Sequence, residues 1–81
     1  MYEIRTDEVA QHQVDALPVE ALPAYAELRV VLETAPWSGG PYHRDNPKGA
    51  LRVHTFGLGM AVYLILDDQR RVDILKVMWV G

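Results

Sequence analysis

Two basic side chains, Arg52 and His54, stand two residues apart in the run Leu51-Arg-Val-His-Thr-Phe56. The run alternates as a strand does, so both side chains share one face, with Cβ atoms roughly 6–7 Å apart. An arginine supplies permanent positive charge, and a histidine exchanges a proton near neutral pH. We predict that this face holds the catalytic residues if the protein has a site. The alternative is a solvated strand face without chemistry.

Further polar candidates lie in the loop that precedes this strand. Residues 36–49 form a 14-residue loop that contains three of the six glycines and three of the five prolines. A loop of this length in a small domain is often functional. It carries His43, Arg44 and Lys48, which we predict to contact phosphates or a partner protein. An ordinary polar loop is the alternative.

The formal net charge of −3 counts against wholesale binding to nucleic acid. The charges are unevenly distributed, however. Residues 1–34 carry seven acidic and two basic residues, whereas residues 35–60 carry three basic residues, one acidic residue and two histidines. The basic character therefore lies in the loop and on the strand that hold the candidate residues.

Three runs rich in strand-forming residues make up the last third of the chain, at 50–56, 60–66 and 71–80. The breakers between them, 57–59 and 67–70, are short, and short connections suit antiparallel neighbours. The middle run is apolar at every position, which predicts a central strand with both faces buried. We therefore predict a three-stranded antiparallel meander.

Two helices are predicted before the loop. The first begins with Thr6 as its N-cap and ends before Pro18. The second begins within residues 19–22, and an apolar stripe predicts that it packs on the sheet through Leu22, Tyr25, Leu28 and Leu32. With a short strand at residues 2–5, the order is βααβββ. We predict a single α+β domain over residues 1–81, with two helices on one face of a small antiparallel sheet.

The size and composition favour a cytoplasmic protein that has a partner. The chain has 81 residues, no cysteine, no signal-peptide pattern and no apolar run of the roughly 20 residues that cross a membrane. A domain this small is only marginally stable alone, so burial of one face against a partner is favoured. The oligomeric state stays open, a homodimer included.

No cofactor is predicted. The three histidines lack the spacing of metal ligands and no cysteine assists them, so we expect no metal site. The segment Gly57-Leu58-Gly59 is better explained as a hairpin than as a phosphate-binding loop.

The arrangement resembles the RelE/ParE family, the toxins of bacterial type II toxin–antitoxin systems. The resemblance covers nearly the whole chain: the opening Tyr2-Glu3-Ile4, the paired helices, the Pro36-Trp37 loop and the meander. Its most telling part runs from Leu51-Arg-Val-His54 through the hairpin to Val62-Tyr63. The resemblance implies a cognate antitoxin protein as partner.

The family contains ribonucleases that cut messenger RNA in the ribosome. Their first meander strand carries alternating basic residues, and Arg52 and His54 match those positions. Cleavage by attack of the 2′-hydroxyl needs a base, cationic support for the phosphate and an acid for the leaving oxygen. The resemblance implies that Arg52 and His54 are catalytic and that Tyr63 contacts substrate. Packing in the central strand is the alternative for Tyr63.

Other family members inhibit DNA gyrase and have no known nuclease site. An arginine usually follows the hairpin glycine in the nucleases, but this chain has Met60-Ala61 there. The nucleases also use a basic, Tyr or His residue near the C-terminal end, where this chain reads Trp79-Val80-Gly81. We rank the endoribonuclease first because the basic pair is a positive match. A gyrase inhibitor and a non-toxic protein-binding module are the alternatives.

Overall fold

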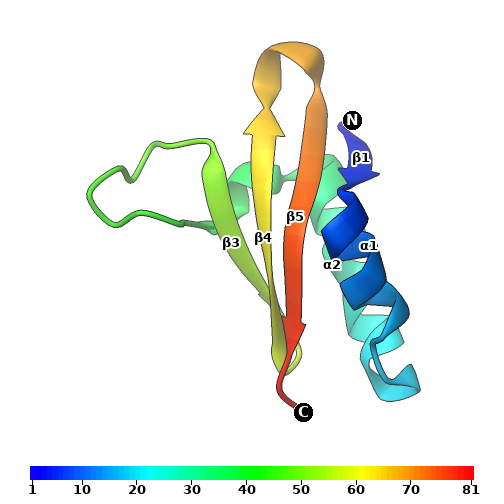
Figure 1. Cartoon of the computed structure of the whole chain (residues 1–81). Coiled ribbons are helices and arrows are strands. Elements are labelled where there is room, and N and C mark those ends of the chain that lie inside the picture. The colour runs from blue at the N-terminus through cyan, green and yellow to red at the C-terminus, as the bar shows by residue number, and fades with distance from the viewer.

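The computed structural model describes residues 1–81 and shows a five-stranded sheet with two helices (Figure 1). The strands are β1 (Glu3–Thr6), β2 (Gly40–Pro41), β3 (Leu51–Phe56), β4 (Gly59–Leu66) and β5 (Arg71–Trp79). The helices are α1 (Glu8–Asp15) and α2 (Leu22–Thr34), and the 3₁₀ turns are η1 (Val19–Ala21), η2 (Pro36–Ser38) and η3 (Asp67–Gln69). The α+β class and the order of the predicted elements are confirmed.

The strand order in the sheet is β1-β5-β4-β3-β2. The pairs β3–β4 and β4–β5 are antiparallel, which confirms the meander. The sheet as a whole is mixed, because β1 pairs with β5 in parallel. Both helices and three strands separate β1 from β5 in the chain, which provides the long connection that a parallel pair requires.

The first helix begins one residue later than predicted. Thr6 belongs to β1, where it lies opposite Ile74, and Asp7 is the N-cap of α1. The Asp7 carboxylate accepts a hydrogen bond from the backbone N–H of Val9 at 3.2 Å. The prediction of Thr6 as the N-cap was wrong because Thr6 is paired with Ile74 as the last residue of β1.

The second helix packs on the sheet through Tyr25, Leu28 and Leu32, all buried as predicted. Leu22 was predicted in the same stripe but is 46% exposed. The stripe is continued by the fully buried Ala21, and Leu22 lies about 100° further around the axis. The prediction that Leu22 packs on the sheet was therefore wrong, because the neighbouring Ala21 occupies the buried position instead.

The core lies between the helices and one face of the sheet. Its sheet residues alternate along the strands: Phe56 on β3, Ala61, Tyr63 and Ile65 on β4, and Val72, Ile74 and Val77 on β5. The change of parity on β5 follows a bulge, where the register shifts between Val62 and Tyr63. Neither helix is long and apolar enough to cross a membrane.

The other face of the sheet has no helix against it, and we call it the open face. Its strongly apolar positions are Leu51, Val53, Met60, Val62, Leu64, Leu66 and Met78. Val62 is buried, but Met60, Leu64 and Leu66 stay partly exposed and Met78 is 39% exposed. The prediction that β4 is buried on both faces was therefore wrong for this face, because no second layer covers it.

Candidate functional site

Arg52 and His54 share one face of β3, as the alternation predicted, but Arg52 is buried. Its guanidinium donates to four backbone carbonyls. Nη1 lies 3.0 Å from the Pro47 oxygen and 3.2 Å from the Gly49 oxygen. Nη2 lies 2.5 Å from the Gly39 oxygen and 3.5 Å from the Trp37 oxygen. The face therefore differs from a solvated one, since Arg52 is bound to the loop above it.

His54 is half-buried. Its Nδ1 lies 2.8 Å from the Thr55 carbonyl oxygen. A carbonyl oxygen only accepts, so in this contact Nδ1 carries the proton and Nε2 of the neutral ring is the free acceptor. This tautomer leaves Nε2 available to take a proton from a bound hydroxyl.

Two shallow hollows meet at His54. The helix-side hollow, about 180 Å³, lies between α2 and β3 and is lined by Glu27, Val31, His54 and Phe56 among others. The loop-side hollow, about 220 Å³, is lined by Ser38, Gly39 and Gly40 as well as His54. Glu27 was not a candidate from the sequence. Only the packing of α2 against β3 places Glu27 at the same hollow as His54.

Tyr63 is fully buried, opposite Arg52 on the neighbouring strand. Its hydroxyl donates to the Pro36 carbonyl oxygen at 2.6 Å. Burial raises the pKa of the Tyr63 hydroxyl, and the nearby Arg52 charge opposes that rise. Tyr63 thus holds the start of the loop, and the contact with substrate stays a prediction.

The three basic residues of the loop, His43, Arg44 and Lys48, are exposed. The loop projects away from the sheet at the left of Figure 1. None of the three side chains lines either hollow beside His54. They therefore lie outside both hollows, and their contacts with phosphates stay a prediction. No three histidine or carboxylate side chains are grouped to hold a metal ion.

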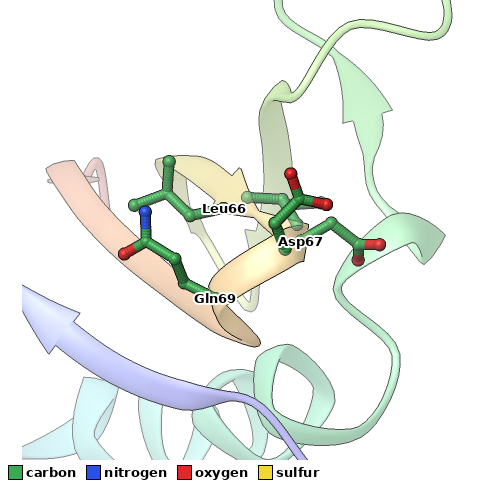
Figure 2. Close-up of a pocket in the computed structure, with 5 residues that line it drawn as sticks. Leu66, Asp67 and Gln69 are labelled. Carbon is green, nitrogen blue, oxygen red and sulfur yellow. The ribbon is translucent and has the colours of Figure 1, made fainter.

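A polar network at the opposite end of β4 was not predicted from the sequence. Asp67, in the turn between β4 and β5, lies at a hollow of about 260 Å³ (Figure 2). Its carboxylate accepts hydrogen bonds from the Tyr2 hydroxyl and, at 3.2 Å, from the Trp37 indole N–H. The Trp37 ring lies 5.3 Å from the Arg52 guanidinium carbon. The network thus connects the N-terminus and the turn to the candidate site.

Acid should weaken this network through Asp67. The hydrogen bonds from Tyr2 and then Trp37 lower the pKa of the Asp67 carboxyl below its ordinary value of 3.8. The stabilisation is therefore fully present above about pH 4 and is lost as the pH falls through the lowered pKa. We expect Asp67→Asn to lower the free energy of unfolding at pH 7, with the difference from the parent protein shrinking below pH 4.

Urea unfolding at a series of pH values measures this effect. Asp68→Asn is the matched control, because Asp68 is the adjacent acid and has no part in the Tyr2–Trp37 network. A difference for Asp67→Asn that stays constant down to pH 2 would contradict the assignment.

Comparison with known proteins identifies the fold. No protein-family model and no curated protein sequence matches the chain. Among solved structures, a chain of the RelBE2 toxin–antitoxin complex from Mycobacterium tuberculosis matches with a TM-score of 0.83 and 26% identity, covering 98% of both chains. The isolated RelE toxin of E. coli matches with a TM-score of 0.81 and 14% identity, over 100% of this chain and 86% of that one.

A third match extends the similarity to an archaeal protein. A chain of the RelE–RelB complex from Pyrococcus horikoshii OT3 matches with a TM-score of 0.65 and 17% identity, over 99% of this chain and 96% of that one. The likeness spans every element of the sheet and both helices rather than a shared fragment. The chain has the fold of the RelE toxins and is similar over nearly its whole length to a chain of a RelBE toxin–antitoxin complex, as its motifs predicted.

Proposed function

We propose that this protein is the toxin of a type II toxin–antitoxin pair and that it acts in the cytoplasm as an endoribonuclease on messenger RNA at the ribosome. The observation that carries the proposal is the match, over 98% of both chains, to a chain of a toxin–antitoxin complex. His54 and the two hollows that it lines support the ribonuclease activity.

The open face supports an antitoxin partner. It presents a row of apolar side chains on three adjacent strands, and β4 is as apolar on this face as on the buried one. Covering this exposed apolar surface with a partner removes it from water, which is favourable for binding. We propose that the antitoxin packs on the open face through an apolar segment of its own.

The proposed cleavage uses His54 and Glu27 as the two proton-transfer groups. One takes the proton of the RNA 2′-hydroxyl as its oxygen bonds to phosphorus, and the other protonates the 5′-oxygen as the phosphorus–oxygen bond breaks. The products are a 2′,3′-cyclic phosphate and a 5′-hydroxyl. An imidazole and a carboxylate at one hollow have the required chemistry. His43, Arg44 and Lys48 would hold the phosphates on either side.

A second function is favoured by one specific observation. The guanidinium of Arg52 is occupied by carbonyls, and the residues that follow the hairpin, Met60-Ala61, bring no base to the site. Cationic support for a reacting phosphate is therefore limited at His54. Inhibition of DNA gyrase, which needs no cleavage of RNA, is the alternative function that this observation supports.

Induced expression in a bacterial host tests these functions together. The ribonuclease predicts growth arrest with new 5′ ends in cellular messages by primer extension, and rescue by the antitoxin. A small acidic DNA-binding protein encoded beside this one is the first candidate for that antitoxin. Growth arrest with intact messages and broken DNA would reject RNA cleavage and support inhibition of DNA gyrase instead. Unimpaired growth at high expression would reject toxicity and leave a protein-binding module.

A further inference from the structure

We propose that Arg52 is a positioning residue, which holds the two ends of the 36–49 loop in place beside His54 instead of binding phosphate itself. The inference rests on the proposed function only where RNA cleavage is the readout. We call the Arg52 guanidinium and the four backbone carbonyls that accept from it the Arg52 clamp. The carbonyls belong to Trp37, Gly39, Pro47 and Gly49.

Four of the five N–H groups of the guanidinium donate hydrogen bonds within the protein. The four N–H groups on Nη1 and Nη2 match the four carbonyls of the clamp. The fifth, on Nε, is buried without a partner. Arg52 as a whole is only 7% exposed. A phosphate could bind this side chain only by displacing carbonyls, each of which would then lose a charge-assisted hydrogen bond.

The clamp joins two segments that are distant along the loop. Nη2 binds the beginning of the loop, at residues 37 and 39, and Nη1 binds its end, at residues 47 and 49. The planar fork of an arginine can bind both ends at once. A lysine ammonium has the same charge but is a single point donor with three N–H groups. Charge and clamping can therefore be separated experimentally.

The clamp also shapes the site next to His54. Gly39, which accepts the shortest of the four hydrogen bonds, lines the loop-side hollow with His54. A Cβ atom at Gly39 would collide with the Tyr63 hydroxyl and lie 2.6 Å from the Val53 carbonyl oxygen. The backbone at Gly39 therefore fits closely between Arg52, Tyr63 and β3. Beyond it, the loop exposes Arg44, and Lys48 is exposed between the two clamped residues at the end of the loop.

Hydrogen exchange on the complete chain tests the proposal without reference to activity. We expect Arg52→Lys to speed exchange of the loop amides of Tyr42, Asn46 and Gly49 about tenfold or more, while the β4 and β5 amides keep their protection. Arg29→Lys on α2 is the matched control and should leave all rates unchanged. Normal loop protection in Arg52→Lys would overturn the proposal.

A second variant covers the case in which Arg52→Lys does not fold. Gly39→Ala keeps the guanidinium and displaces the Gly39 carbonyl, so it should produce the same faster loop exchange. Unchanged exchange in a folded Gly39→Ala protein would also overturn the proposal.

RNA cleavage provides a separate readout if the protein proves to be a nuclease. Both variants should raise the KM for RNA more than they lower kcat, and the pH profile set by His54 should stay the same. Full activity in Arg52→Lys, with a loss in Arg52→Gln, would show that the charge itself acts on phosphate. A protein that cleaves no RNA would refute the ribonuclease proposal, while the exchange data would still decide the role of Arg52.

Discussion

Replacing His54 with alanine should lower the rate of messenger RNA cleavage about 10²–10⁴-fold, the usual contribution of a group that transfers a proton in the transition state. The structure leaves Nε2 of His54 free, because Nδ1 is engaged with the Thr55 carbonyl. The side chain also lies where the two hollows meet. No other side chain of the protein has both a free imidazole nitrogen and a place in these hollows.

Single-turnover cleavage of a message in purified ribosomes is the appropriate measurement, since it separates chemistry from product release. His12→Ala is the matched control, because His12 is exposed on α1 and lines neither hollow. The control should cleave at the rate of the parent protein. If His54→Ala also cleaves at that rate, the chemistry lies on other residues.

Glu27 can be tested in the same assay, as the second half of this prediction. With a carboxylate and an imidazole sharing the proton transfers, the pH–rate profile should be bell-shaped. Glu27→Gln should remove one limb of the profile and His54→Ala the other. If both limbs of the pH–rate profile are unchanged in Glu27→Gln, Glu27 is not the second proton-transfer group.

Placing a charge on the open face should have the second large effect, on binding of the antitoxin. Met78 is 39% exposed on β5, opposite Met60, so Met78→Asp leaves the carboxylate in water in the free protein. A partner that covers the face would bury the carboxylate without a counter-charge, at a cost of several kcal/mol. We expect the Kd to rise about 10²–10³-fold, which corresponds to roughly 3–4 kcal/mol.

Titration calorimetry with the purified antitoxin measures this change. Val9→Asp is the control, because Val9 is 59% exposed in the first turn of α1, where an added acid is tolerated. Thermal unfolding of the free variants should show that both fold. Equal affinities for Met78→Asp and the parent protein would place the antitoxin on another surface.

The sequence predicted the local structure well because that structure depends on neighbours in the chain. Strand alternation and short breakers are sufficient to define β3, β4 and β5, since each hairpin closes over a few residues. The stripe Tyr25, Leu28 and Leu32 likewise depends only on helical spacing. The errors at Thr6 and Leu22 both lie at helix ends, where strand pairing or a one-residue shift in the stripe decides the outcome.

The candidate site was predicted in part. Alternation was enough to put Arg52 and His54 on one face, because the side-chain period of a strand is two residues. It could not show that the loop folds back over Arg52, since that requires contacts to residues 37 and 39, which are 15 and 13 positions away. Glu27 was missed for the same reason, because it reaches the hollow only through the packing of α2 on β3.

By itself, then, the sequence determined both helices, all strands except the short β2 within the predicted loop, their order, most of the apolar stripe of α2 and the pairing of basic residues on β3. Each of these follows from periodicity and turn chemistry within a short window. The tertiary structure alone decided that β1 joins β5 in parallel, that Arg52 is clamped by carbonyls, and that one apolar face of β4 stays uncovered. These features arise where distant segments compete for the same surface and the same hydrogen-bond partners, and the whole fold settles that competition.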